Sequence, residues 1–151
     1  MKITTFTDYS LRVLIYVATA PEGRGTIAEV SQAYGVSEHH LVKVVHLLGR
    51  AGFLANTRGR GGGLSLAMPA SRIRVGDVVR ATEGDGMPVD CEDKVRGTCA
   101  IAGACRLAGV LDQAMGAFRA VLDRYTLEDL VQGPHRERMT VILHGPAFEA
   151  A

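Results

Sequence analysis

The sequence IAEVSQAYGVSEHHLVKVVHLLGR, residues 27–50, predicts two helices joined by a tight turn. Apolar residues recur at helical spacing from Ile27 to Tyr34, and again from about Glu38 to Arg50. Gly35 can take the left-handed conformation that ends a helix, and Ser37 is a good N-cap for the next one. Two helices with a short glycine-containing turn between them are typical of a helix-turn-helix.

The second of these helices has two chemically different faces. Leu41, Val44, Val45 and Leu48 form an apolar stripe, and the opposite side carries cations and imidazoles without an acid. Such a face suits the major groove of DNA, where side chains meet phosphates and base edges. We therefore expect contacts to DNA from Ser37, His39, His40, Lys43, His46 and Arg50.

A basic, glycine-rich hairpin is predicted after this helix. Residues 53–57 and 64–67 have the character of two short strands, and Arg58-Gly59-Arg60-Gly61-Gly62-Gly63 lies between them. This pattern favours the wing of a winged helix, in which Arg58 and Arg60 contact DNA and Arg58 reaches a narrow minor groove. A phosphate-binding loop for a nucleotide is the alternative, but the segment lacks the Gly-Lys-Ser/Thr ending and no helix follows directly.

Charge is distributed unevenly along a chain of 151 residues whose net charge is only +1. Residues 37–74 carry six basic side chains and one acidic one, whereas residues 75–151 carry eight basic and twelve acidic ones. A basic middle segment is an electrostatic signature of phosphate binding, although a solvated charged face would give the same count. The basic segment coincides with the predicted helix-turn-helix and wing.

Other protein classes find little support in the sequence. No apolar run is long enough to span a membrane, and the first residues lack the pattern of a secretion signal, so we expect a cytoplasmic protein. The histidines lie on the predicted DNA-facing helix or near the C-terminus, without a nucleophile–base pattern. We therefore do not expect an enzyme. An iron–sulfur carrier would not need the basic wing.

The remaining segments predict further helices at residues 8–20, 75–82 and 106–125. Thr7 or Asp8 is expected to cap the first of these. A short helix is expected to start at residue 126 and to end at Gly133-Pro134. The helix at 106–125 has a seam of heptad spacing, which favours packing against a second copy over packing on its own chain. The seam residues are Leu107, Leu111, Ala114, Phe118, Val121 and Tyr125. The expected fold is mainly α with a small β-hairpin wing, a winged helix-turn-helix plus a long dimerisation helix.

Three cysteines, Cys91, Cys99 and Cys105, lie within fifteen residues of a glycine-containing stretch that lacks periodicity. An odd number of clustered cysteines in a cytosolic chain indicates a metal or redox function instead of a disulfide framework. A structural zinc site would need a fourth cysteine or a nearby histidine, and a metal-free thiol switch is a further alternative. The expected division is a DNA-binding domain at 1–82, a cysteine loop at 83–105, a dimerisation helix at 106–125 and a C-terminal helix and tail at 126–151.

Several segments, in this order and spacing, resemble the bacterial winged-helix iron–sulfur-sensing repressors of the NsrR/IscR type. These segments are Phe6-Thr7-Asp8-Tyr9-Ser10-Leu11-Arg12, Tyr34-Gly35-Val36-Ser37, Leu41-Val42-Lys43, Arg50-Ala51-Gly52-Phe53, the glycine-rich hairpin, Arg74-Val75-Gly76-Asp77-Val78-Val79-Arg80, Ala104-Cys105-Arg106-Leu107 and Tyr125-Thr126-Leu127-Glu128-Asp129-Leu130. The sequence is most similar to the nitric-oxide-sensing NsrR branch. The resemblance covers nearly the whole chain.

The resemblance implies a homodimeric repressor that binds a palindromic operator in double-stranded DNA and whose affinity is controlled by a cluster sensitive to nitric oxide, with oxygen or iron status as alternative signals. It implies a 4Fe-4S cluster held by Cys91, Cys99 and Cys105, with Asp8 of the other subunit as the fourth ligand. The IscR branch, with a two-iron cluster, has a histidine where this chain has Ala108, and the gap from Cys91 to Cys99 is a few residues longer than the family pattern. A 2Fe-2S cluster, or no cluster in the isolated protein, remains an alternative. Apart from the resemblance, Asp8 is an acid that stabilises the start of its helix.

Overall fold

The computed structural model describes residues 3–57, 63–84, 92–93, 97–101 and 104–145. Its elements are the helices α1 (Thr5–Thr19), α2 (Ile27–Tyr34), α3 (Glu38–Arg50), α4 (Val75–Glu83), α5 (Leu107–Leu122), α6 (Leu127–Val131) and α7 (Pro134–His144), a 3-10 turn (Ala70–Arg72), and the strands β1 (Arg24–Gly25), β2 (Leu54–Thr57), β3 (Gly63–Leu66), β4 (Glu92–Asp93) and β5 (Gly97–Thr98). The expected fold is confirmed: it is mainly helical, with a small antiparallel wing sheet. Within these residues no helix has the length and apolar character needed to cross a membrane.

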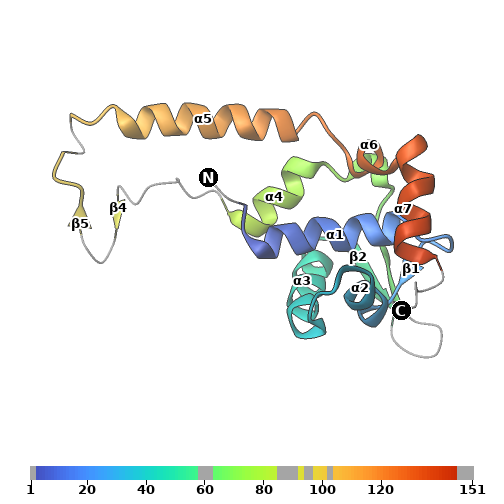
Figure 1. Cartoon of the computed structure of the whole chain (residues 1–151). Coiled ribbons are helices and arrows are strands. Elements are labelled where there is room, and N and C mark those ends of the chain that lie inside the picture. Colours follow the sequence, from blue (N-terminus) through green and yellow to red (C-terminus); the bar gives the residue numbers. More distant parts are fainter. Residues whose placement is uncertain (1–2, 58–62, 85–91, 94–96, 102–103, 146–151) are drawn as a thin grey trace.

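The core lies where α1 meets α2, α3, α4 and α6. Val13, Leu14 and Val17 of α1 are at most 1% exposed, and they pack in one cluster with Leu41 and Leu48 of α3. The apolar stripe predicted for α3 is therefore the buried one. In Figure 1, α1 crosses the middle of the molecule with α2 and α3 on one side and α4 on the other. The core fixes the orientation of α3, because its buried face leaves only the opposite face to solvent.

The first helix begins earlier than predicted. Thr4, instead of Thr7 or Asp8, is its N-cap, and the Thr4 hydroxyl accepts a hydrogen bond from the Thr7 backbone N–H. Thr7 is fully buried, and its hydroxyl bonds Thr82 of α4. Glu83 accepts bonds from the Thr4 backbone N–H and hydroxyl, at 2.7 and 2.9 Å. This contact spans 79 residues, so local sequence does not reveal it.

The wing sheet has one strand more than the predicted hairpin. Its order is β1-β3-β2, with Arg24 opposite Ser65 and Leu54 opposite Leu66. A Cβ at position 63 would lie 2.9 Å from the carbonyl oxygen of Gly25, so a side chain there would collide with β1. Gly63 is thus explained by strand packing and does not require the close approach of DNA.

The second half of the chain departs from the prediction in three places. The helix predicted at residues 106–125, α5, ends at Leu122 instead of Tyr125, since residues 123–126 return the chain to the core: the Val75 backbone N–H donates to the Tyr125 carbonyl at 2.9 Å. Gly133-Pro134, expected to end a helix, also starts α7, because proline is well suited to the first helical position. β4 and β5 pair within the stretch expected to lack regular structure.

Candidate nucleic-acid interface and cysteine segment

The turn before α3 is fixed by hydrogen bonds from both the backbone and a side chain; the Val36 backbone N–H donates to the Ser31 carbonyl at 3.1 Å. Gly35 has φ +63°, in the left-handed region, as its sequence position predicted. The Ser31 hydroxyl donates to the Val36 carbonyl at 2.6 Å. Ser37 occupies the N-cap position of α3, but its exposed side chain makes no capping bond. Its hydroxyl therefore remains available to a ligand at the start of α3.

The polar face of α3 is exposed as the helical spacing predicted. All five predicted side chains are exposed, namely His39, His40, Lys43, His46 and Arg50. His40 lies beside Tyr9 of α1, with ring centroids 6.4 Å apart. The only acid on α3 is Glu38 in its first turn, where it suits the helix dipole. The rest of this surface presents positive or neutral donors to an anionic partner.

Half of this face borders a depression of about 450 Å³ between α3, the start of α1 and the end of α4. Lys43, His46 and Arg50 surround it, and Phe6 and Leu47 form part of its apolar lining. Apolar walls beside cations strengthen the local positive potential, since they exclude part of the solvent. The depression extends the electrostatic surface of α3 toward α4.

The wing strands lie beside α3, but both predicted wing arginines, Arg58 and Arg60, lie outside the described residues. β2 and β3 emerge from the core through Leu54 and Leu64, which are 3% and 5% exposed. The base of the wing is therefore anchored. Any contact from the two arginines to DNA stays a prediction.

Asp8 lies on the first turn of α1 and already has a partner. Its carboxylate pairs with Arg12 one turn later, at 3.0 Å, and the two side chains are 45% and 42% exposed. The Arg12 guanidinium also lies 5.5 Å from the ring centroid of Tyr34, whose pKa burial raises to about 12. Our sequence analysis missed Arg12, although its spacing of four residues from Asp8 is that of helical ion pairs. An exposed pair of this kind is weak, so Asp8 can exchange partners at low cost.

Of the cysteines, Cys99 is exposed, Cys105 is half-buried, and both are free thiols. Cys91 lies outside the described residues. Figure 1 shows β5, which immediately precedes Cys99, beyond the start of α5 and well away from α1. Within the described part of one chain, no three side chains among His, Cys, Asp and Glu come together as a metal site. Among the described residues of one subunit, the strand before Cys99 is therefore not brought to the first turn of α1, which carries Asp8.

The start of the cysteine segment (residues 83–105) is nevertheless hydrogen-bonded to the start of α1. Glu83, the last residue of α4, is held by Thr4 and by the Thr7 hydroxyl. Burial alone would raise the pKa of Glu83, but the hydrogen bonds from Thr7 and Thr4 outweigh it and lower the pKa. The charged carboxylate therefore connects the chain entering the cysteine segment with the turn that carries Asp8.

Comparison with known proteins assigns the chain to one family of transcriptional regulators. The family model Rrf2, described as iron-dependent transcriptional regulator, matches residues 3–133, which leaves α7 outside the match. CymR (YrzC) of B. subtilis, a global cysteine regulator, is 32% identical, with a TM-score of 0.65 and coverage of 86% of this chain and 95% of that one. The oxidized form of Staphylococcus aureus CymR is 28% identical, with a TM-score of 0.68 and coverage of 88% and 98%. IscR of T. potens, at 24% identity, has the same fold, with a TM-score of 0.64 and coverage of 86% and 85%.

Proposed function

The chain belongs to the Rrf2 family of transcriptional regulators, and we propose that it is a homodimeric repressor whose affinity for a palindromic operator is controlled by an iron–sulfur cluster. Its function is the regulation of transcription and not catalysis, as expected from the sequence. The observation that carries the DNA-binding part is the exposed face of α3. Within this proposal, α3 enters the major groove and the wing follows the adjacent minor groove.

The dimer part is supported by the exposure of α5. No residue of α5 is fully buried in the single chain, and Leu107, Val110 and Val121 are 56%, 59% and 43% exposed. Exposed apolar side chains in one stripe are typical of an interface. Leu111 and Phe118, which the heptad pattern placed in the same seam, are half-buried. The stripe along Leu107, Val110 and Val121 is therefore the surface that we assign to the second subunit.

The ligand part is supported by the chemistry of the donor set. Cys99 and Cys105 are free thiols, and the half-exposed Asp8 carboxylate is held only by Arg12. Thiolates are the ligands that iron–sulfur clusters prefer. We propose that Cys91, Cys99 and Cys105 of one subunit and Asp8 of the other hold a 4Fe-4S cluster, as in the NsrR branch. Bound there, it would supply a site at which nitric oxide reacts, with the carboxylate as a weaker ligand than the thiolates.

Arg12 is the partner of Asp8 when no cluster is bound. When Asp8 is not a ligand, Arg12 neutralises it within its own helix, as the 3.0 Å pair shows. The Glu83 contacts to Thr4 and Thr7 connect the entry of the cysteine segment to the same turn of α1. Ligation across the dimer would thereby fix the distance between the two α3 helices, and simultaneous binding to both half-sites depends on that distance.

A thiol switch without a cluster is the second candidate, and one observation favours it. Cys99 is exposed, and exposed thiols are the ones open to oxidation. A similar protein, CymR of Staphylococcus aureus, has a structure described as an oxidized form. A structural zinc site finds no third ligand among the described residues.

The test is anaerobic purification of the full chain, followed by its absorbance spectrum and by iron, sulfide and zinc analysis. We expect about four iron and four sulfide per subunit for a 4Fe-4S cluster. An operator is then selected from random double-stranded DNA with the same preparation. Stoichiometric zinc, or a colourless protein whose DNA binding changes only with thiol oxidation, would contradict the cluster. Failure to select any DNA sequence would contradict the DNA-binding part.

A further inference from the structure

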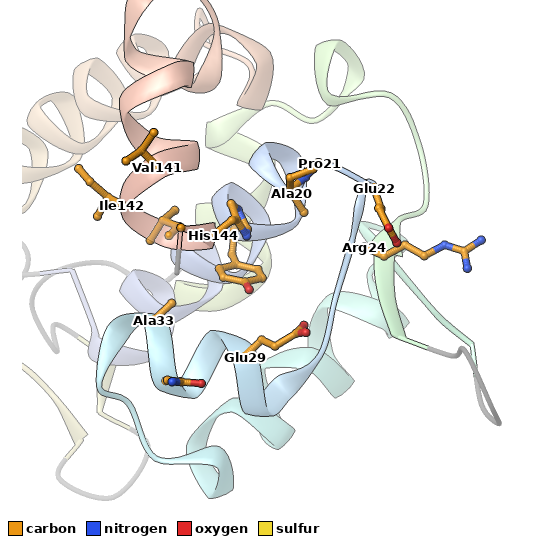
Figure 2. Close-up of a pocket in the computed structure, with 13 residues that line it drawn as sticks. Ala20, Pro21, Glu22, Arg24, Glu29, Ala33, Val141, Ile142 and His144 are labelled. Atoms are coloured by element: carbon orange, nitrogen blue, oxygen red, sulfur yellow. The ribbon is translucent and has the colours of Figure 1, made fainter. Parts of the chain in front are cut away.

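A second depression lies between α7, α2 and the residues that join α1 to β1, and its volume is about 870 Å³. Figure 2 shows it with α7 above and α2 below, and with Glu22 of the turn after α1 and Arg24 of β1 at one side. Small-molecule sites in proteins measure about 300–1,000 Å³. Neither the DNA-binding face nor the cysteine segment uses this depression, and α7, which forms one wall, lies outside the family match.

The α7 wall is held by His144. Its Nε2 lies 3.0 Å from the hydroxyl of Thr19, and its ring lies 4.3 Å from that of Tyr16. The Thr19 hydroxyl also lies 2.9 Å from the Ile15 carbonyl, and the tautomer of His144 decides whether the hydroxyl donates to Nε2 or accepts from it. Thr140 adds a bond from its hydroxyl to the Thr19 carbonyl at 3.3 Å. These contacts fix the C-terminal half of α7 on the end of α1.

The walls offer two different surfaces. On α7, Val141 and Ile142 are 71% and 75% exposed, the largest exposed fractions among the large apolar side chains of the described residues. Glu29 lines the same depression from α2, which lies below α7 in Figure 2. The Glu29 Oε2 atom accepts from the Thr26 backbone N–H at 2.7 Å, which fixes the carboxylate in place. Glu22 adds a second carboxylate to the lining.

The charge balance of the depression favours a cation. Among the described residues of its lining, Arg24 is the one guanidinium, against the two carboxylates of Glu22 and Glu29. Burial lowers the pKa of His144, despite the opposing effects of the Tyr16 carbonyl and Glu29, so this imidazole is neutral when α7 is docked. The Tyr16 ring, which packs against Gly25 at the base of the wing sheet, adds an aromatic surface.

We propose that this depression is an effector site for an amphipathic organic cation. The ammonium group binds at Glu29 and Glu22, and the apolar body lies on Val141 and Ile142. Both walls opposite α7 lead to DNA-reading elements: α2 continues through the turn into α3, and Arg24 of β1 pairs with Ser65 of the wing strand β3. A bound ligand therefore changes DNA affinity to the extent that it binds the two arrangements of these elements unequally.

The experiment uses the full chain and 1-naphthylmethylamine as the probe, measured by isothermal titration calorimetry. Two matched probes, 1-naphthylacetate and 1-naphthalenemethanol, carry an anion and no charge on the same ring system. We expect saturable binding of the amine, at least about tenfold tighter than binding of the acetate, because its charge meets the fixed carboxylate. Comparable affinity for amine and acetate, or no saturable binding of the amine, would overturn the proposal.

Three variants locate the site. Glu29→Gln keeps an oxygen that can accept from the Thr26 N–H but removes the charge, and Ile142→Lys places a competing cation on an exposed position. Each should weaken the amine about tenfold or more, while Glu137→Gln, on an exposed part of α7 outside the lining, leaves it unchanged. Unchanged affinity in both Glu29→Gln and Ile142→Lys would place the amine elsewhere and refute the site. Operator affinity should shift at least about threefold with saturating amine, and no shift would refute the effector role.

Discussion

Arg80 of α4 and Asp123, in the turn after α5, form an ion pair in which Nη2 and Oδ1 lie 2.8 Å apart. Arg80 also bonds Asp77 in its own helix at 2.6 Å. The hydrogen bond and charge of Arg80 hold the pKa of Asp123 below its usual range. Asp123 packs directly on Gly76, where any side chain would overlap its carboxylate. The pair thereby fixes the end of the proposed dimerisation helix to the winged-helix body.

We expect Asp123→Asn to lower the free energy of unfolding at neutral pH. In the wild type, a carboxyl whose folded-state pKa is lowered contributes stability above its ordinary pKa, and this contribution is lost as the pH falls below about 4. The variant should therefore differ from the wild type at neutral pH and converge with it in acid. Urea unfolding at about pH 7 and about pH 3 measures both points.

Gly76→Ala provides an independent check of the same contact, because it displaces Asp123 without changing any charge. We expect a loss of about 1–3 kcal/mol in the free energy of unfolding, typical of overpacking. Equal stability of Asp123→Asn and wild type at neutral pH, together with a neutral Gly76→Ala, would show that the contact does not hold α5 to the body.

The α3 face should determine the salt dependence of DNA binding. Lys43→Ala and Arg50→Ala each remove one exposed cation, so each should weaken operator binding and reduce the slope of log affinity against log salt by about one if the side chain meets a phosphate. Fluorescence anisotropy at several salt concentrations gives both quantities. The control is Arg136→Ala on α7, which is also exposed but lies on a different element. A slope unchanged in both α3 variants would remove this face from the interface.

The apolar stripe of α5 should hold the dimer. Val110 is 59% exposed in the single chain, so Val110→Glu leaves the subunit fold intact but places an unpaired charge in the proposed interface. We expect monomers by sedimentation velocity, with an unchanged circular dichroism spectrum. Ala120→Glu introduces the same charge at an exposed position away from the stripe and should stay dimeric. A stable dimer in Val110→Glu would assign the interface to another surface.

Docking of α7 should depend on pH through His144. Because burial lowers the pKa of this imidazole in the folded chain, its neutral form favours docking. The resulting stability is present above the ordinary histidine pKa of about 6.5 and is lost as the pH falls through the lowered value. Amide exchange of α7 should therefore be faster at about pH 5.5 than at about pH 7.5, after correction for intrinsic rates, whereas His144→Gln should show similar protection at both. Equal protection in the wild type would contradict the role of His144.

Much of the fold follows from local sequence. The turn at Gly35, the buried stripe through Leu41 and Leu48, and the two wing strands are consequences of spacing and residue type, and the structure has them where these patterns predict. The features that local sequence did not predict depend on contacts with residues far away in the chain. Thr4 becomes the cap because Glu83 holds it, and β1 is a strand only through its pairing with β3.

In the candidate site, too, some features follow from local sequence and others depend on distant contacts. The exposure of His39, Lys43 and Arg50 follows from helical spacing, so the sequence suffices to predict that face. The Asp8–Arg12 pair also follows from a local rule, because the two residues are four positions apart on one helix. His144 could not be predicted as an anchor for α7, because its partners Tyr16 and Thr19 lie on the first helix.

The central claim is that a cluster joining the two subunits through Asp8 controls operator affinity, and the direct measurement is an anaerobic titration of the selected operator with four samples. These are the cluster-loaded protein, the empty protein, the loaded protein after nitric oxide, and loaded Asp8→Ala, with Asp112→Ala on the exposed side of α5 as the control variant. We expect the loaded wild type and the control to bind distinctly tighter than the empty and nitric-oxide-treated proteins, and Asp8→Ala to lose part of that difference while it remains a dimer. Equal affinities of the loaded and empty proteins would contradict the account.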